Sequence, residues 1–506
     1  MYPTILTAQQ LRNSTNFTFS SNPTATASEI ITAAAKSFVA EFVLHFGNTQ
    51  PVFILCGNGG NGANGLAVAR LLSQAQFTVT AICVRAAAES SPLIATERSL
   101  LQEKTNATVI SMALEEGFKL PEMPENAILI DAILGTGQNK ALGKYLMELI
   151  FIVNKLDVTR VALDVCTGLP TEGMPAKSAF KAAFTFTVHA PKLAFFQSEN
   201  EKYIGQVKVL DIGLTNIDPD SFKYYYLTKK CLQQLLIPRA KFSHKGSYGR
   251  SLLIGGSLGM MGAAILAGRA ALRSGVGLLT FYAPQCGYEV LQATVPEAMV
   301  FNDPHKYYVS VLKNLKTSYY DGIGIGCGMG NNRTTQPFFD ELMRSLTPDL
   351  KVVIDADALN ALADKPELWA FVPKLAILTP HFKEFDRLFG RAPDSYTRLR
   401  KAQEAAAKFH VIIVIKGASS AVVFPDGKIY YNTTGNPGMA VGGTGDVLTG
   451  IITGLLAQGY SQKDAALLGV YWHGASGDCA AHELTERCMT AQSVVDNMHR
   501  ALKQAR

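Results

Sequence analysis

Residues 435–450 read GNPGMAVGGTGDVLTG, a run of small residues that leads into an apolar helical pattern and places one carboxylate, Asp446, at the junction. Small residues let backbone amides approach an anion without a side chain between them. A helix that begins here adds unpaired N–H groups and a partial positive charge. Asp446 would then face a bound phosphate and could take a proton from a nearby hydroxyl. The stretch therefore predicts phosphoryl transfer or a phosphate-assisted reaction.

Elsewhere the chain alternates short β-branched runs with turns and helical patterns. In the first half we expect strands at Val52–Cys56, Val79–Val84, Ala127–Asp131, Val161–Val165 and Ala183–His189. In the second half we expect them at Ser251–Ile254, Leu278–Tyr282, Gly322–Ile325, Val352–Ile354, Ala376–Leu378, Val411–Ile415 and Ala421–Phe424. Such alternation predicts α/β architecture, with parallel sheets covered by helices on both faces.

The composition changes around residues 211–231, where a Pro/Asp/Asn-rich piece is typical of a connection. A new glycine-rich sequence begins at His244. We therefore expect two domains, residues 1–225 and 226–506, with no internal repeat between them.

The overall composition narrows the classes of function. The chain has 506 residues, 48% of them hydrophobic, and a net charge of +6 without a basic block. This charge argues only weakly for nucleic acid and fits anionic small-molecule substrates equally well, and we expect no nucleic-acid partner. None of its eight cysteines form a C-x-x-C pair, so neither a zinc site nor a disulfide framework is expected, and a reducing cytoplasm fits. We expect no signal peptide and no membrane span.

Chemistry-bearing residues of the second half follow strand ends, where α/β sheets bind ligands. Asp355 and Asp357 follow one strand, and Asp357 has the alternative role of capping a helix over 358–363. His381 could touch a substrate, with Glu384 supporting a cap, and the small polar loop 416–420 suits a nucleotide's phosphate or ribose, or a solvated turn. We expect His473 to be a packed helix residue.

Taken in order, the motifs HKGxxG, GxGxG, DADALN, LTPHxxE, KGASS and NPGMAxGGTGD resemble the ADP/ATP-dependent NAD(P)H-hydrate dehydratases, which have a ribokinase-like α/β fold. The resemblance covers nearly all of residues 226–506. One departure is Cys327, where that family usually has proline.

This resemblance implies dehydration of (S)-NAD(P)H-hydrate at the expense of ADP or ATP, with Mg²⁺ bridging the phosphates. Asp446 would be the catalytic base. The substrate would also meet Ala263, Gly328 and His381. The nucleotide would be bound by Lys416, Gly417, Ala418, Ser419, Ser420, Asn436, Pro437, Gly438, Met439, Ala440, Gly442, Gly443, Thr444 and Gly445.

The first half contains a strand, glycine turn and helix over residues 53–72, the geometry of a pyrophosphate cradle. Asp131 and Asp164 follow two further strands, so three sites meet at one sheet edge and predict a dinucleotide pocket. An ordinary NAD(P)-binding Rossmann domain is the alternative. Against it, Val84-Arg85 stands where that fold places an acidic residue.

This half resembles NAD(P)H-hydrate epimerase, with a Rossmann-like three-layer α/β/α fold, so the two halves together resemble the bifunctional NAD(P)H-hydrate repair enzymes. The resemblance implies K⁺ ligands at Asn61, Asp131 and Thr167, and Lys192 also matches the family pattern. It implies substrate contacts from Gly60, Asn61, Gly62, Ala63, Asn64, Gly135, Thr136, Gly137, Gln138, Asn139, Lys140, Ala141 and Asp164.

The epimerase loop of that family usually reads Asn-Asn-Gly-Gly-Asp, whereas this chain has Gly60-Asn61-Gly62-Ala63-Asn64. Thr167 stands where serine is common, Cys166 where proline is common, and a helix glutamate upstream is missing. Because these losses fall in one site, we expect weakened epimerisation, with the domain kept as a scaffold or binding module. A ribokinase-like kinase of a vitamin or sugar is the alternative for the whole chain. We expect a homo-oligomer.

Overall fold

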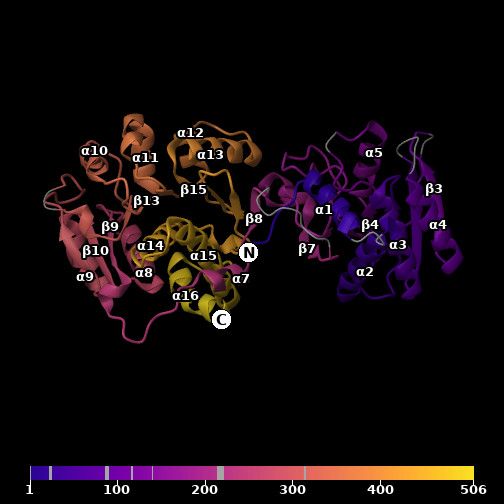
Figure 1. Ribbon diagram of the computed structural model, residues 1–506, viewed down its shortest axis with the longest axis horizontal. Coiled ribbons are helices and arrows are strands. Elements are labelled where there is room, and N and C mark those ends of the chain that lie inside the picture. Colours follow the sequence, from indigo (N-terminus) through magenta and orange to yellow (C-terminus); the bar gives the residue numbers. More distant parts are fainter. Residues whose placement is uncertain are drawn as a thin grey trace. The chain divides into compact units, whose positions relative to one another are not determined.

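The computed structural model describes residues 2–21, 26–85, 91–115, 118–138, 141–213, 222–312 and 315–505 (Figure 1). The chain divides into two compact units. The N-terminal unit comprises residues 4–222 and 394–396, and the C-terminal unit comprises residues 1–3, 223–393 and 397–506. The expected boundary between residues 225 and 226 lies within a strand, β8 (Tyr224–Tyr226), that pairs with the C-terminal sheet.

The N-terminal unit is built on a seven-stranded parallel sheet in the order β3-β2-β1-β4-β5-β6-β7. Its strands are β1 (Val52–Cys56), β2 (Val79–Arg85), β3 (Thr108–Ala113), β4 (Ile128–Ala132), β5 (Thr159–Leu163), β6 (Phe184–Val188) and β7 (Gln206–Leu210). Its helices are α1 (Ala8–Ser21), α2 (Ala27–His45), α3 (Gly60–Gln74), α4 (Pro92–Lys104), α5 (Lys144–Val153) and α6 (Glu201–Ile204).

Alternate residues of β1 enter different cores, as the pleat of a strand requires. Val52, Ile54 and Cys56 pack with α2 and α3, whereas Phe53 and Leu55 pack with α5 on the other face. The expected three-layer α/β/α arrangement is therefore confirmed.

The C-terminal unit has a ten-stranded sheet in the order β11-β10-β9-β12-β13-β14-β15-β16-β17-β8. Its other strands are β9 (Arg250–Ile254), β10 (Leu278–Ala283), β11 (Met299–Asn302), β12 (Gly322–Ile325), β13 (Val352–Ile354), β14 (Ile377–Leu378), β15 (Ile412–Ile415), β16 (Ala421–Val423) and β17 (Ile429–Tyr431). Its helices are α7 (Lys229–Leu235), α8 (Met261–Ser274), α9 (Tyr288–Thr294), α10 (Thr335–Ser345), α11 (Ala356–Asp364), α12 (Phe382–Phe389), α13 (Ser395–Phe409), α14 (Thr444–Ala457), α15 (Gln462–Leu484) and α16 (Ala491–Ala505).

The expectation of parallel sheets holds for all pairs except β15–β16 and β16–β17, which are antiparallel. The sequence patterns did not predict β3, β7, β8, β11 and β17. Four of these are the first or last strand of a sheet. An edge strand has only one hydrogen-bonded neighbour and often a solvated face, so its hydrophobic pattern is weak.

Helix α14, which follows the glycine loop, is the central helix of its unit. Every residue from Val447 to Ala457 is buried. A Cβ atom at Gly450 would lie 2.0 Å from the carbonyl oxygen of Ala267 on α8, so the two helices approach closely only because this residue is glycine. This close packing of α14 against α8 fixes the position of the helix start, and of Asp446 with it, above the sheet.

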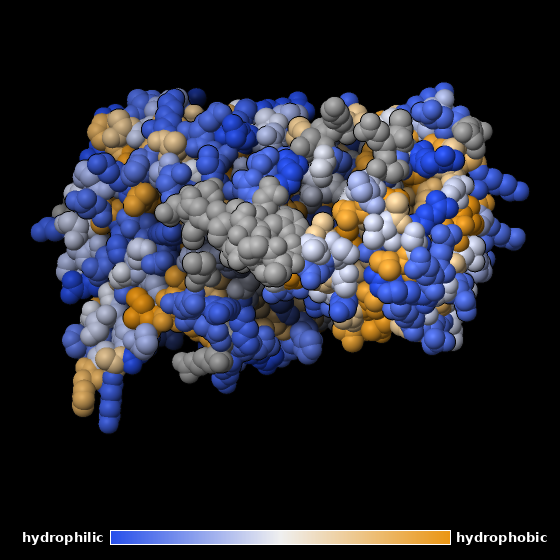
Figure 2. Space-filling model, turned by 45° about the vertical axis from the view of Figure 1, so that its right-hand side comes forward, coloured by the Kyte–Doolittle hydropathy of each residue, from blue (hydrophilic) through white to orange (hydrophobic). Residues whose placement is uncertain are grey.

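In the described part of the chain, every helix is too short or too polar to traverse a lipid bilayer. Figure 2 shows hydrophilic side chains over most of the visible face, with hydrophobic ones gathered in small groups between them.

Candidate functional site

Asp446 lies in the first turn of α14, as the glycine loop predicts. The N-cap residue, Gly443, has a φ of 96°, a left-handed conformation that glycine adopts without strain, and it offers no side-chain cap. A Cβ atom at Gly442 would meet nothing within 4 Å. The turn thus leaves open space at Gly442, just before the helix N-terminus, which suits an anion.

The carboxyl group of Asp446 is held in a state suited to proton transfer. Burial and the nearby charge of Asp355 raise its pKa from 3.8 to about 6, and Asp357 adds to the effect. The thiol of Cys327 donates a hydrogen bond to this carboxylate, and the bond opposes the rise. A carboxylate with a pKa near 6 is ionised at neutral pH and is a stronger base than an ordinary aspartate.

Asp355 is a buried structural carboxylate at the end of β13. Its Oδ1 accepts a hydrogen bond of 2.8 Å from Lys416 Nζ, and its Oδ2 accepts one of 2.7 Å from Thr449 Oγ1 on α14. Burial opposes the charge on Lys416, but Asp355 and Glu384 raise its pKa above the ordinary value. Lys416 therefore carries a fixed positive charge beside Gly445, where a Cβ atom would lie 3.3 Å from Nζ.

The two acids after β13 have roles other than capping. Helix α11 begins at Ala356, and its N-cap residue is Asp355, whose side chain makes no capping bond. Asp357 lies within the first turn and accepts a hydrogen bond of 2.8 Å from the amide of Gly330. The alternative that Asp357 caps this helix is therefore wrong, because the helix begins earlier and the carboxylate turns to a neighbouring loop.

Ala263 and Gly328, two of the expected substrate contacts, lie against each other. Gly328 has a φ of 62°, and its Cβ position is 3.0 Å from the Cβ of Ala263 on α8. The preceding residue is Cys327, so this loop after β12 brings the thiol, Ala263 and Asp446 together. The turn accommodates cysteine at the position where the related family usually has proline.

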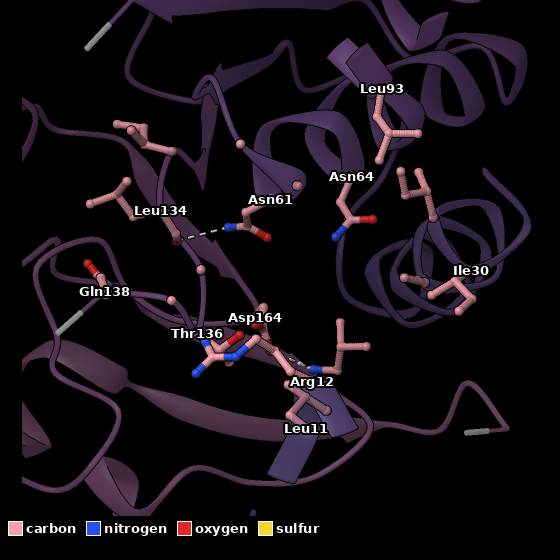
Figure 3. A pocket seen from close by; sticks show the side chains of 18 of the residues that line it. Leu11, Arg12, Ile30, Asn61, Asn64, Leu93, Leu134, Thr136, Gln138 and Asp164 are labelled. Atoms are coloured by element: carbon pink, nitrogen blue, oxygen red, sulfur yellow. Dashed lines mark hydrogen bonds between the residues drawn. The ribbon is translucent and has the colours of Figure 1, made fainter. Parts of the chain in front are cut away.

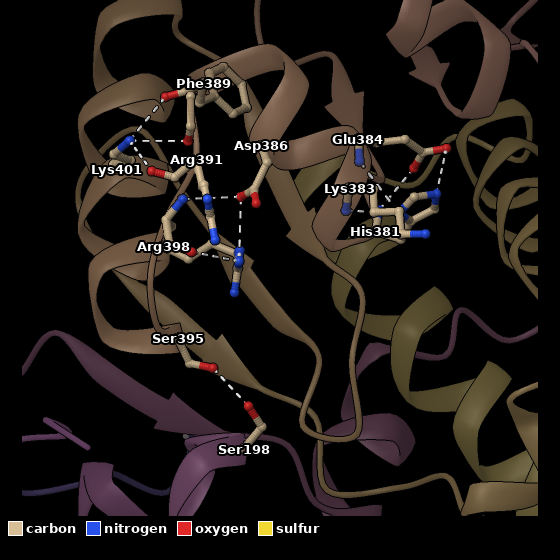
Figure 4. Close-up of polar contacts among 12 residues, drawn as sticks. Ser198, His381, Lys383, Glu384, Asp386, Phe389, Arg391, Ser395, Arg398 and Lys401 are labelled. Atoms are coloured by element: carbon tan, nitrogen blue, oxygen red, sulfur yellow. Dashed lines mark hydrogen bonds and ion pairs between the residues drawn. The ribbon is translucent and has the colours of Figure 1, made fainter. Parts of the chain in front are cut away.

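His381 is the N-cap residue of α12 (Figure 4). Its Nδ1 accepts from the amide of Lys383 at 3.1 Å, and Glu384 returns the bond by accepting from the His381 amide at 2.9 Å. The expected capping role of Glu384 is thus confirmed. The His381 side chain is half exposed, so it remains accessible at this strand end.

The expected nucleotide-binding residues form two turns of the same unit. Ser420 Oγ accepts from the amide of Gly417 at 3.2 Å, which closes the turn over residues 416–420. Asn436 begins a short 3₁₀ helix over Pro437–Met439, accepts from Gly438 and donates to Asp478 at 3.0 Å. Ala418 and Ser419 belong to the first turn, and Ala440 follows the 3₁₀ helix of the second. Thr444 is the first residue of α14, and its Oγ1 donates to the carbonyls of Met439 and Val441.

His473 lies within α15, and burial lowers its pKa to about 4. The ring is therefore neutral at pH 7, which agrees with a packed helix residue.

A cavity of about 950 Å³ opens in the N-terminal unit at the carboxyl ends of its strands (Figure 3). The expected residues that line it are Gly60, Asn61, Asn64, Gly135, Thr136, Gly137, Gln138, Ala141 and Asp164. Two expected residues do not line it: Gly62 packs against the Gly57 carbonyl, and Ala63 is in the core. Asn139 and Lys140 lie outside the described residues.

Two residues of this cavity add to the expected site: Arg12 was not predicted from the sequence, whereas Asn64 was predicted as a substrate contact. Arg12, on α1, lines the cavity, and nothing in its local pattern marks it as functional. Oδ1 of Asn64 is buried and makes no hydrogen bond with any described residue. An amide oxygen in this state is available to a ligand donor.

The three expected K⁺ ligands lie together beside this cavity. Asp131 is fully buried and accepts from the Thr167 amide and hydroxyl, each at 2.7 Å. Asn61 Nδ2 donates to the carbonyls of Leu134 and Leu163, so the side-chain oxygen of Asn61 takes no part in these two bonds. Burial raises the pKa of Asp131 to about 6, although Thr167 opposes the rise. A buried carboxylate surrounded by neutral oxygen donors fits a monovalent cation.

Asp164 and Lys192 form a buried ion pair with an Oδ1–Nζ distance of 2.7 Å. Asp164 has a φ of 70°, a conformation that non-glycine residues seldom adopt and that often marks a functional position. Lys192 also donates to Thr187 Oγ1 and to the carbonyls of Val188 and Ala190. The pair fixes Asp164 at the floor of the cavity.

Comparison with known proteins accounts for both units. Residues 251–500 match the family model described as NAD(P)H-hydrate dehydratase, and residues 27–194 match the one described as YjeF-related protein N-terminus. The bifunctional NAD(P)H-hydrate repair enzyme Nnr of Moorella thermoacetica is 33% identical over 462 residues, which cover 88% of this chain and 86% of that protein. The enzyme of the same name from Coxiella burnetii is 31% identical over 483 residues, 93% of this chain and 94% of that protein.

Among solved structures, the ADP/ATP-dependent NAD(P)H-hydrate dehydratase from Bacillus subtilis, co-crystallised with ATP/Mg²⁺, is 34% identical. It covers 56% of this chain and 98% of its own, with a TM-score of 0.49. Both relatives align with this chain over most of their length, and this chain belongs to the family of bifunctional NAD(P)H-hydrate repair enzymes.

Proposed function

We propose that this protein restores NADH and NADPH from their hydrates. The C-terminal unit dehydrates the S epimer at the expense of ADP or ATP, and the N-terminal unit binds the hydrates and interconverts their R and S epimers. The observation that carries the first assignment is Asp446, a base with a pKa of about 6 at the start of a helix whose N-terminus is open to an anion.

The dehydration follows from a change of leaving group. Asp446 removes the proton from the C6 hydroxyl of the hydrate, and the oxygen attacks the terminal phosphoryl group of the nucleotide. The bond between that phosphorus and its bridging oxygen breaks, which releases AMP from ADP or ADP from ATP. The amides of residues 442–445 stabilise the negative charge that develops there. The lone pair of the ring nitrogen then expels phosphate from C6, and loss of a proton from C5 restores the dihydronicotinamide ring.

The C-terminal unit supplies charged and polar groups for the nucleotide and for its metal ion. Lys416, beside Gly445, supplies positive charge next to the phosphates, and the turns at 416–420 and 436–440 hold the remainder of the nucleotide. Ala263, Gly328 and His381 face the hydrated ring. Asp357 offers carboxylate oxygen, the ligand type that Mg²⁺ prefers, and bound Mg²⁺ would neutralise phosphate charge.

In the N-terminal unit we assign K⁺ to Asn61, Asp131 and Thr167. We assign the hydrate to the large cavity that Asp164 lines. Asn64 replaces the acidic residue that the family usually has at this position. An amide cannot accept or release a proton near neutral pH, so we propose that epimerisation is slow while binding persists. We propose a homo-oligomer, which light scattering tests.

The proposal is tested with purified protein, Mg²⁺, K⁺ and an equilibrium mixture of S and R NADH-hydrate, started with ADP or ATP. Dihydronicotinamide absorbance is followed with time. We expect rapid recovery of the S fraction and slow recovery of the remainder. Recovery of the whole pool at the initial rate would show a fully active epimerase. Failure to recover the S fraction with either nucleotide would overturn the assignment and favour a kinase.

A further inference from the structure

A second cavity, of about 180 Å³, lies at the carboxyl ends of β1, β2 and β3. Cys56, Cys83 and Ser111 are register partners on these three strands, so their side chains leave the same face of the sheet. Arg85, two residues beyond Cys83, leaves that face as well. Helix α4 supplies Arg98, whose guanidinium donates to Ser111 Oγ at 3.3 Å.

The chemistry of this cavity is that of an anion site. Arg85 and Arg98 both line it, and the residues lining it in the described ranges include no acid. Within those same ranges, no ion pair involves either arginine, so their charges face the cavity without a compensating carboxylate. The planar fork of a guanidinium matches phosphate oxygens, and Ser111 adds a hydroxyl donor.

The size of the cavity limits what it can hold. A volume of 180 Å³ is about six times the share of one liquid water, which is roughly 30 Å³. It accommodates a phosphate group with a few waters and is too small for a nucleoside. The ligand is therefore one charged group of a larger molecule or a free anion.

One turn of the chain connects this cavity with the larger one. Gly57 and Asn58 line the small cavity, and Gly59–Asn61 line the large one. In dinucleotide-binding α/β folds the pyrophosphate crosses such a turn, and the end of the second strand recognises the adenosine ribose. There an acidic residue binds a free 2′-hydroxyl, whereas an arginine accommodates a 2′-phosphate. Arg85 is the last residue of β2.

We propose that the small cavity binds the 2′-phosphate of the adenosine ribose, so that the N-terminal unit prefers NADPH-hydrate to NADH-hydrate. The inference rests on the proposed function, in which the larger cavity holds the hydrated ring. The turn at Gly57–Asn61 lies under the pyrophosphate, and Arg85 and Arg98 bind the 2′-phosphate. A ligand with a free 2′-hydroxyl leaves both arginine charges unpaired.

The test measures equilibrium binding of ADP-ribose 2′-phosphate and of ADP-ribose to the full chain by calorimetry. Neither ligand carries a nicotinamide ring, so the result does not depend on epimerisation. The double variant is Arg85→Gln with Arg98→Gln, and the control is Lys104→Gln, which removes one positive charge from the exposed end of α4. Thermal unfolding checks that all variants fold.

We expect the wild type to bind the 2′-phosphate form about tenfold to a hundredfold more tightly, because charge-assisted bonds contribute about 1.5–3 kcal/mol and 1.4 kcal/mol is tenfold. The double variant should bind both ligands alike, and Lys104→Gln should keep the preference. Equal binding by wild type would overturn the 2′-phosphate site and leave the proposed function intact. Binding of neither ligand would overturn dinucleotide binding by this unit as well.

A free phosphate ion has the same chemistry as a ribose 2′-phosphate, and competition with inorganic phosphate distinguishes these two ligands of the small cavity. Under the proposal inorganic phosphate competes weakly with ADP-ribose 2′-phosphate and not with ADP-ribose. Tight phosphate binding without discrimination between the two dinucleotide fragments would identify a free-phosphate site and overturn the assignment.

Discussion

The raised pKa of Asp446 makes the dehydratase reaction sensitive to acid in a way that an ordinary aspartate would not. With a pKa of about 6, Asp446 is about one-tenth ionised at pH 5 and about nine-tenths ionised at pH 7. An aspartate with its ordinary value of 3.8 would be more than about nine-tenths ionised at both. We therefore expect kcat/KM to fall nearly tenfold from pH 7 to pH 5.

The hydrogen bond from Cys327 provides a way to shift the acid limb of the pH–rate profile. Because that bond opposes the rise, Cys327→Ala should raise the pKa of Asp446 further and shift the acid limb toward higher pH. Asp446→Asn removes the base and should lower kcat by about 10²- to 10⁴-fold at pH 7, with a smaller ratio at pH 5 where the wild-type base is already mostly protonated. The measurement is S-hydrate turnover with ADP in buffers of constant ionic strength.

The same shift has a consequence for stability, with a definite sign. A raised pKa in the folded state means that the ionised carboxylate is disfavoured by folding, so its cost is absent below pH 3.8 and complete above about pH 6. Two pKa units correspond to at most about 3 kcal/mol, reduced by the partial exposure of Asp446. Asp446→Asn should therefore raise the unfolding temperature at pH 7.5 and leave it unchanged at pH 3.5.

These expectations can fail separately. A flat rate profile between pH 5 and 7 with intact protein would refute the argument that burial and Asp355 hold this carboxylate near pH 6. A limb that moves toward lower pH in Cys327→Ala would refute the assigned direction of the thiol bond. Equal unfolding temperatures of wild type and Asp446→Asn at pH 7.5 would refute the cost of the buried charge.

Three further substitutions test other parts of the molecule. Lys416→Met leaves a buried carboxylate without its cation and should cost about 3–5 kcal/mol of unfolding free energy in urea, whereas Lys428→Met, in an exposed pair, should cost under about 1 kcal/mol. Gly62→Ala places a Cβ atom 1.8 Å from a backbone oxygen and should destabilise the N-terminal unit, but Gly60→Ala meets nothing within 4 Å and should be neutral or stabilising by calorimetry. Asn64→Asp, combined with Gly60→Asn, should speed R-hydrate recovery, and no gain would contradict the assignment of weakened epimerisation to these positions.

Much of the fold could be predicted from the sequence, because its signals are local. Buried central strands such as β1 and β12 are short apolar runs between turns, and a helix start is marked by small residues followed by an apolar period. The glycine loop before α14 and the carboxylate within its first turn were identified on this basis. Edge strands such as β3 and β11 were missed because half-exposed strands lack such a run.

The same distinction between local and long-range contacts applies to the site residues. The α/β class, the position of Asp446 and the glycine turn before α3 could be read from local patterns, since each depends on residues adjacent in the chain. Folding brings Asp355 to Lys416 and Thr449, which lie 61 and 94 residues away, and places Arg12 in the wall of the large cavity. It also places Arg85 and Arg98 in one cavity. The physical reason is that ionisation and pairing depend on burial and on neighbours from other elements, which no local pattern encodes.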